Sequence, residues 1–432
     1  MDYFAIFAKT EKTDTMKQLK YLFLLLALVL PLMQLHADEP FRKHRYNAFS
    51  VLPVGPENIV MMGNSITNMH EWWEALGDHR ILNRGVSGAV SDEMLENLDP
   101  IVSGHPAKVF IMIGTNDIGY GQSREHIADN LQKIITRFQQ ESPATRIYVQ
   151  SILPSGNGSR GGKIAGTNEL LRSVCRKANV TFIDLYDLLG DGEGHMKAGW
   201  SFDDLHPKAI GYRAWCNALI PYLDEGTGQT HRCNYVEQLP DIHENRFDSF
   251  GARLGTLSQL PIQADDMVFI GDEMIHSGEW HELLNTPKAK NRGTGWGYPG
   301  GDMGWFMKEI PHLLHGNKAN QCPATIVLYA GAQEAENGTD IGAFESQYRE
   351  LLALLHREAP TAHIRILSVL RNENTEKDAR FTQAYNKVLQ QIAKKDKQAT
   401  FVDICTPLRA EGMMTGPYVS GMGYLKIAEL LR

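Results

Sequence analysis

The sequence contains the same pattern twice. Residues 57–76 (ENIVMMGNSITNMHEWWEAL) match residues 265–284 (DDMVFIGDEMIHSGEWHELL), and both stretches are typical of an apolar strand, a glycine turn and a helix. Four further matches follow in the same order, at offsets of 208 to 219 residues. They pair NRG with NRG, VFIMIGTND with IVLYAGAQE, RIYVQSILP with HIRILSVLR, and VTFIDLYDLL with ATFVDICTPL. Five matches in one order predict two copies of one fold.

Each copy alternates short apolar, β-branched runs with longer amphipathic stretches such as 124–140 and 345–357. Alternating strands and helices are typical of an α/β fold with a parallel sheet and helices on both of its faces. We expect the strands of the first copy at 58–62, 81–83, 108–113, 146–151 and 181–184.

The N-terminus has the order of a secretory signal. Lys17 and Lys20 precede an apolar run at 21–33 that is too short for a comfortable membrane span. We therefore expect a signal peptide at 1–37 and export to the periplasm or the outside of a bacterium, with no stable membrane span after its removal. An N-terminal anchor is the alternative. Residues 1–15 fit no signal, so Met16 is a candidate true start.

The rest of the chain divides into three parts. We expect a first domain at 38–223, a linker at 224–243 and a second domain at 244–432, because the linker stretch is polar and carries Gly226, Gly228 and Pro240. The 432 residues are enough for two domains. The oligomeric state is not readable from the sequence.

Charge and cysteine usage limit the function classes. The formal net charge of -8, without a basic cluster, argues against a nucleic-acid partner. The five cysteines show no metal-ligand spacing and no C-x-x-C pair, so neither a metal nor another cofactor is expected. An oxidising compartment would permit a disulfide, but its pairing is not readable from the sequence.

Four polar motifs follow expected strands of the first domain. They are the serine of GNSIT (Ser65), the glycine of NRG (Gly85), the asparagine of GTND (Asn116), and the aspartate and histidine of DDLHP (Asp203 and His206). Functional groups of open parallel sheets gather at the carboxyl ends of strands. Each motif alone is more typical of a helix cap or a turn. Together they form the inventory of an ester hydrolase.

Acyl transfer explains why these residue types would occur together. A serine hydroxyl is a poor nucleophile until an imidazole accepts its proton, and a carboxylate must hold that imidazole in one tautomer. Ser65, His206 and Asp203 supply these groups, with Asp204 as a rival carboxylate. The backbone N–H groups of Ser65 and Gly85 and the side-chain amide of Asn116 would bind the oxyanion.

In these four motifs the first domain resembles the SGNH hydrolases, the GDSL-type esterase and lipase family. The resemblance implies a flavodoxin-like three-layer α/β/α fold around a five-stranded parallel sheet. It also implies Ser65 as nucleophile, Gly85 and Asn116 in the oxyanion hole, and Asp203 with His206 as the other triad members, the family spacing favouring Asp203 over Asp204. Asn64 stands where the family pattern has an aspartate.

The second copy keeps the pattern but not the polar groups. Glu273 stands at the position of Ser65, Gln333 replaces Asn116, Gly293 matches Gly85, and neither an aspartate nor a histidine surrounds Tyr418, where His206 would align. We expect a degenerate, inactive domain that buries a face of the first one. A carbohydrate-binding role is the alternative, with Trp280, Trp296 and Trp305 as candidate stacking residues.

The substrate class rests on the resemblance. The first domain looks most similar to platelet-activating-factor acetylhydrolase-like and sialate O-acetylesterase-like branches, which implies hydrolysis of acetyl esters, and we favour those on carbohydrate. A lysophospholipase or thioesterase with the same triad is the enzymatic alternative, and a non-catalytic glycan-binding protein is the alternative of another class. We expect the pocket rim at 87–91, 118–122 and 155–163, with Trp72, Trp73 and Trp200 as candidate walls.

Overall fold

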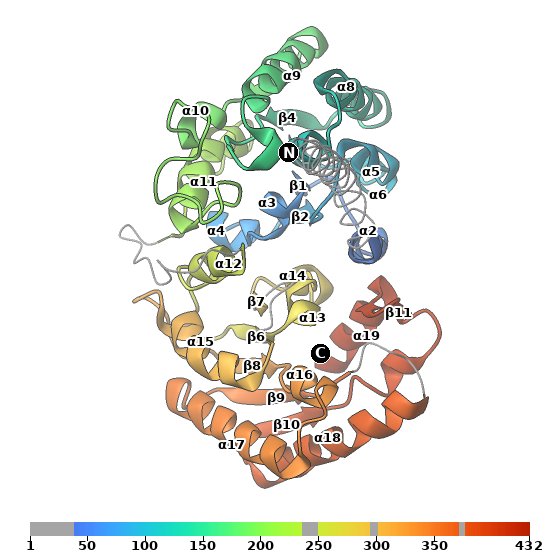
Figure 1. Ribbon diagram of the computed structural model, residues 1–432, viewed down its shortest axis with the longest axis vertical. Coiled ribbons are helices and arrows are strands. Elements are labelled where there is room, and N and C mark those ends of the chain that lie inside the picture. Colours follow the sequence, from blue (N-terminus) through green and yellow to red (C-terminus); the bar gives the residue numbers. More distant parts are fainter. Residues whose placement is uncertain (1–38, 236–248, 294–300, 371–375) are drawn as a thin grey trace, which may run out of the picture.

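The computed structural model describes residues 39–235, 249–293, 301–370 and 376–432, and it contains two five-stranded parallel sheets (Figure 1). The order of the first sheet is β2-β1-β3-β4-β5, and that of the second is β10-β9-β8-β6-β7, which is the same arrangement. Both α/β domains predicted from the repeat are therefore confirmed. The strands of the first sheet are β1 (Ile59–Gly63), β2 (Ile81–Gly85), β3 (Lys108–Met112), β4 (Arg146–Gln150) and β5 (Thr181–Ile183). Those of the second are β6 (Met267–Gly271), β7 (Ala289–Gly293), β8 (Thr325–Leu328), β9 (His363–Leu367) and β10 (Ala399–Val402).

Helices cover both faces of each sheet, as buried parallel strands require. In the first domain, apolar residues of α8 (Arg124–Glu141) and α9 (Ile164–Ala178) pack on one face, and those of α11 (Ala209–Asp224) pack on the other. In the second domain, α15 (Met303–His315), α17 (Ile341–Glu358) and α18 (Glu376–Lys395) pack on one face, and α19 (Gly421–Leu431) packs on the other. Each domain is thus a three-layer sandwich.

The two copies also share their local hydrogen bonds. The side chain of Asn64 caps the short helix α3 (Ser65–Asn68) by accepting from the Ile66 N–H at 3.0 Å, and Asp272 caps α13 (Glu273–His276) in the same way. Tyrosine hydroxyls of α11 and α19 donate to the carbonyls of the second residue of α3 and of α13. The second domain has therefore kept the scaffold of the first-strand motif although its serine is replaced.

Reciprocal ion pairs join the two domains. Arg84 binds both carboxylate oxygens of Glu282, at 2.8 and 2.7 Å, and Arg292 binds both oxygens of Glu74 at 3.0 Å. In each pair the arginine is the penultimate residue of the strand with the NRG motif. The glutamate lies on the second short helix after the glycine turn, α14 (Trp280–Leu283) or α4 (Trp72–Leu76). Partners that exchange roles in this way form an isologous interface, as in a twofold-symmetric dimer.

Each domain is preceded by a helix that packs on the other domain. The helix α2 (Glu39–Val51) lies against α19, and α12 (Ser249–Leu257) lies against α11 (Figure 1). Arg45 of α2 donates to the Ser277 carbonyl and to Glu279, while Arg253 of α12 donates to the Met69 carbonyl and to Glu71. Each helix therefore donates hydrogen bonds to the opposite domain, in the same reciprocal arrangement as the ion pairs.

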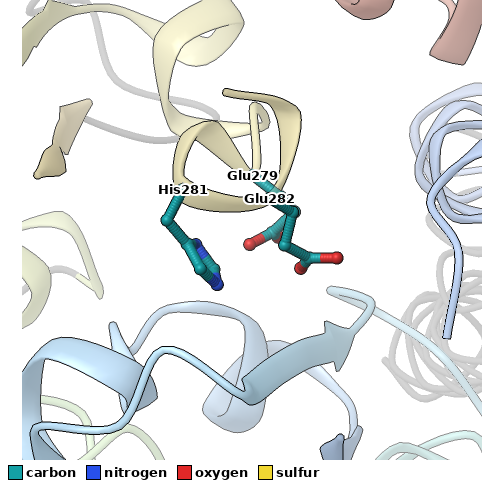
Figure 2. Close-up of side chains that lie close together, drawn as sticks. All are labelled: Glu279, His281 and Glu282. Carbon is teal, nitrogen blue, oxygen red and sulfur yellow. The ribbon is translucent and has the colours of Figure 1, made fainter. Parts of the chain in front are cut away.

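Glu279, His281 and Glu282 point from the second domain toward the first (Figure 2). Their ligand atoms lie within 4.8 Å of one another, a spacing that could hold a metal ion. Both carboxylates, however, are already bound by guanidinium groups, Glu279 by Arg45 and Glu282 by Arg84. Burial lowers the pKa of His281 to about 4, and its ring stacks on Trp73 with centroids 4.9 Å apart. The cluster is therefore part of the domain interface.

Several sequence predictions concern the segments around the domains. The predicted signal peptide lies outside the described residues, as do residues 236–243 of the predicted linker. Residue 224 ends α11, and residues 225–235 pack back on the first domain, where the Asn234 N–H donates to the Ala75 carbonyl at 2.7 Å. No helix of the described part of the chain is long and apolar enough to cross a membrane. All five cysteines are free thiols.

Four of the tryptophans named from the sequence are core residues. Trp72 and Trp280 are each 1% exposed, and Trp73 and Trp305 are also buried, so none of the four offers a ring face to a ligand. The indole N–H groups of Trp72 and Trp280 donate to carbonyls of α3 and α13. Trp200 is half-buried, and Trp296 lies outside the described residues.

Candidate active site

Ser65, His206 and Asp203 form one hydrogen-bonded chain. Ser65 Oγ lies 3.0 Å from His206 Nε2, and His206 Nδ1 lies 2.7 Å from Asp203 Oδ2. With the ring proton on Nδ1, the imidazole donates to Asp203 and accepts from the serine hydroxyl. The structure therefore brings together the three side chains that the sequence predicts as a triad, in the geometry that acyl transfer requires.

The turn after β1 fixes the serine. Ser65 is the first residue of α3, so its hydroxyl stands at the carboxyl end of the strand and its backbone N–H at the start of the helix. Gly63 permits the tight turn, because a Cβ at this position would lie 2.0 Å from Thr67 Oγ1. The Tyr212 hydroxyl donates to the Ile66 carbonyl at 2.7 Å and holds the helix from the other side.

The hydrogen bonds around Asp203 favour its ionised form. Its Oδ1 accepts the backbone N–H groups of His206 at 2.8 Å and of Leu205 at 3.1 Å. Burial opposes ionisation, but the hydrogen bond from His206, the charge of that ring and these backbone donors outweigh it, and they hold the pKa of Asp203 well below its usual range. The carboxylate can therefore orient His206 and stabilise its protonated form.

Asp204, the rival carboxylate, faces away from His206. Its Oδ2 accepts the Gly156 N–H at 2.7 Å and lies 2.7 Å from His195 Nδ1, and its Oδ1 accepts the Met196 N–H at 2.8 Å. The residue has a left-handed φ of +55°, which turns adjacent carboxyl groups to different sides. Asp204 therefore ties two loops to the triad turn.

The predicted oxyanion donors differ in their availability. Asn116 donates one amide hydrogen to the Ala89 carbonyl at 3.0 Å, which leaves the other for a ligand, and the Ser65 N–H has no acceptor among the described residues. The Gly85 N–H, in contrast, already donates to Asn83 Oδ1 at 2.9 Å. In this structure it is not free to bind an oxyanion, contrary to the sequence prediction.

Gly85 instead serves close packing. A Cβ on it would lie 2.3 Å from the Asn68 nitrogen, so only glycine lets β2 approach α3. The sequence reasoning missed Gly88, which has φ +82° and an N–H without an acceptor among the described residues. It precedes Ala89, the residue to which Asn116 donates. Its signal is the second glycine of NRGVSG.

The loop at 155–163 packs against the triad turn and the Asn116 helix. Asn157 Nδ2 donates to the Asp203 carbonyl at 2.9 Å, and Arg160 Nε donates to the Thr115 carbonyl at 3.1 Å. Thr115 begins the helix α7 (Thr115–Gly119), which contains Asn116. The predicted rim loop therefore lies beside both the triad turn and the helix that contains Asn116.

The corresponding place in the second domain holds different chemistry. Burial raises the pKa of Glu273 to about 8, and its carboxylate accepts from the Ser277 hydroxyl. Tyr418, at the position of His206, stacks on His44 of α2 with centroids 5.0 Å apart. Gln333 donates to Asn337 at 3.2 Å. None of these side chains forms a serine–histidine–carboxylate chain within the described residues.

Comparison with solved structures gives several partial matches. A protein from Streptococcus pneumonia that is named after platelet activating factor is 30% identical, with a TM-score of 0.41, and the match covers 46% of this chain and 99% of that one. An acetylxylan esterase from Geobacillus stearothermophilus is 15% identical, with a TM-score of 0.33, over 40% of this chain and 95% of the other.

Comparison with curated proteins gives an N-acylneuraminate cytidylyltransferase of Escherichia coli that is 27% identical over 169 residues. The match covers 38% of this chain, and the chain spans only 39% of the length of that relative. Residues 62–214 match the model of the GDSL-like lipase/acylhydrolase family, and this range contains all the triad and oxyanion candidates. Residues 62–214 are therefore a GDSL-like lipase/acylhydrolase domain.

Proposed function

We propose that the first domain is an exported serine esterase that hydrolyses acetyl esters of carbohydrates. The observation that carries this proposal is the chain from Ser65 Oγ through the His206 ring to Asp203, with distances of 3.0 and 2.7 Å. Family membership supports ester hydrolysis as the reaction.

The reaction proceeds through an acyl-enzyme. As Ser65 Oγ attacks the ester carbonyl, its proton passes to His206 Nε2, and the Asp203 carboxylate stabilises the resulting imidazolium. His206 then gives that proton to the oxygen of the leaving alcohol. Water, deprotonated by the same nitrogen, attacks the acyl-enzyme, and Ser65 regains its proton as acetate leaves.

The tetrahedral intermediates place negative charge on the former carbonyl oxygen. The Ser65 N–H, the second amide hydrogen of Asn116 and the Gly88 N–H are the donors we assign to it, in place of Gly85. Such donors typically contribute about 2.7 to 4 kcal/mol each to lowering the barrier.

A sugar is the alcohol we assign to the substrate. The partial relative is named for action on an N-acylneuraminate, which is a sugar acid, and this supports a carbohydrate. The second domain serves as a non-catalytic partner, since Glu273 and Tyr418 replace the nucleophile and the base.

The test compares 4-nitrophenyl acetate with 4-nitrophenyl decanoate, using the wild type, Ser65→Ala and Glu273→Gln. We expect hydrolysis of the acetate ester to fall about 10⁴-fold or more in Ser65→Ala and to persist in Glu273→Gln. Unchanged turnover in Ser65→Ala would show that Ser65 is not the nucleophile. A preference for decanoate would favour a lysophospholipase or thioesterase, and wild type without any hydrolysis would favour a glycan-binding protein.

The alcohol is tested separately. Acetate release from O-acetylated sugars by the wild type, absent in Ser65→Ala, supports the carbohydrate assignment. Hydrolysis of 4-nitrophenyl acetate without release of acetate from any sugar would contradict the carbohydrate assignment.

A further inference from the structure

The guanidinium of Arg160 lies beside the candidate site and has no carboxylate partner among the described residues. Arg160 is half-buried, and its Nε donates to the Thr115 carbonyl, one residue before Asn116. Its guanidinium covers Gly119 at the other end of α7, because a Cβ on that glycine would lie 2.6 Å from Arg160 Nη2. Arg160 thus lies along the helix that presents the oxyanion donor.

The carboxylates nearby are committed to other groups. Asp203 is close enough to act electrostatically on Arg160, but its oxygens accept from His206 and from backbone N–H groups. Asp204 accepts from Gly156, His195 and Met196. Among the described residues, Arg160 makes no ion pair, and its one acceptor is a neutral carbonyl.

Arg160 differs in this respect from three other half-buried or buried arginines of the domain. Arg42, Arg84 and Arg172 each bind a glutamate or aspartate. Removing a guanidinium from water without a counter-ion is unfavourable, and burial lowers the pKa of Arg160 below its ordinary value. The guanidinium is therefore available to bind an anion that the described residues do not supply.

We propose that Arg160 binds an anionic group on the alcohol part of the ester, so that the enzyme prefers O-acetylated sugar acids. This inference rests on the proposed esterase function. With the ester carbonyl at Asn116 and Ser65, a sugar extending along α7 would bring a carboxylate to Arg160. The planar fork of the guanidinium matches a carboxylate or a phosphate with two parallel hydrogen bonds.

The experiment uses matched pairs of substrates. One pair is the mono-O-acetylated methyl glycoside of glucuronic acid and the same sugar as its carboxamide, which differ in charge but hardly in shape. The other pair is 1-acetylglycerol 3-phosphate and 1-acetylglycerol, which reports whether the anion is a phosphate. A preference of the wild type for the charged member, in kcat/KM, identifies the anion.

Arg160→Gln is the main variant. We expect it to lower kcat/KM for the charged member of the preferred pair about 10- to 100-fold, mainly through KM, while the neutral member keeps its rate. Arg160→Lys restores part of the preference because it keeps the charge but loses the fork. Arg124→Gln removes the same charge from an exposed arginine paired with Glu125, and we expect no change.

The outcomes separate this inference from the esterase function. Equal loss on charged and neutral substrates in Arg160→Gln would show a structural role and overturn the proposal, as would a wild type that hydrolyses both members equally. Ser65-dependent hydrolysis of 4-nitrophenyl acetate in either case would leave the esterase function intact. Absence of all hydrolysis would overturn both.

Discussion

Arg292 of the second domain binds both carboxylate oxygens of Glu74 of the first, at 3.0 Å each, and both side chains are 0% exposed. Arg84 and Glu282 repeat this bond in the opposite direction, and all four residues are related by one offset of 208 in the sequence. Two copies that contact each other through the same residues behave as subunits of a homodimer. The chain is therefore a covalently linked pseudo-dimer.

Removal of this buried arginine should strongly destabilise the protein. Arg292→Met leaves the Glu74 carboxylate buried without a partner, and we expect the free energy of unfolding to fall by about 3 to 5 kcal/mol. Urea denaturation measures the change. The double variant Arg292→Met with Glu74→Met should recover most of the lost free energy of unfolding, because no unpaired charge is then buried.

An exposed pair provides the control for this prediction. Arg349 and Glu345 form an ion pair on the surface of α17, and Arg349→Met should change the free energy of unfolding by less than about 1 kcal/mol. Similar losses in Arg292→Met and Arg349→Met would contradict a dominant role of the buried pair.

The repeat was enough to predict the fold, because hydrophobic periodicity is local. The first strand was expected at 58–62 and is Ile59–Gly63, and the strand expected at 81–83 extends to Gly85. The docking of the two domains could not be predicted in this way. That Arg84 meets Glu282 depends on contacts between residues far apart in the sequence, and no periodicity reports such contacts.

The candidate site could likewise be predicted only in part from the sequence. Ser65, Asp203 and His206 could be found because parallel strands bring their carboxyl ends to one edge. The engagement of the Gly85 N–H was missed, although its acceptor, Asn83, lies only two residues earlier. An asparagine that binds a backbone N–H two residues on is a known turn, so this signal was present in the sequence. Arg160 belongs to none of the four motifs, so no pattern in the sequence pointed to it.

Asp203 and Asp204 should differ sharply in their effect on catalysis. Asp203→Asn keeps the shape but removes the carboxylate that holds the His206 tautomer, and we expect kcat to fall about 10⁴-fold. Asp204→Asn weakens contacts to Gly156 and His195, away from the reacting atoms, so a loss of roughly tenfold or less is expected. Steady-state kinetics with 4-nitrophenyl acetate decide the matter, and equal losses would refute the separation of their roles.

Asn116 should contribute to the transition state rather than to substrate binding. Asn116→Ala removes an amide donor, and we expect kcat to fall about 10²- to 10³-fold with little change in KM. Gln333→Ala makes the matching change in the second domain and should leave both constants unaltered. A loss confined to KM in Asn116→Ala would argue against an oxyanion role.

The carboxyl of Glu273 should make stability depend on pH. Burial raises its pKa to about 8 in the folded chain, above its ordinary value of 4.5. Below the ordinary value both states are protonated, so the folded state carries no penalty there. As the pH rises toward 8 the unfolded chain ionises first, and stability is lost by up to about 1.4 kcal/mol per pH unit.

Glu273→Gln keeps the acceptor for the Ser277 hydroxyl but cannot ionise. We therefore expect its free energy of unfolding to match that of the wild type near pH 4.5 and to exceed it increasingly up to pH 8. Asp272, whose pKa burial raises to about 7, retains a smaller slope of the same sign in the variant. Urea denaturation across this range gives the comparison, and parallel curves for the two proteins would show that Glu273 is ionised in the folded state.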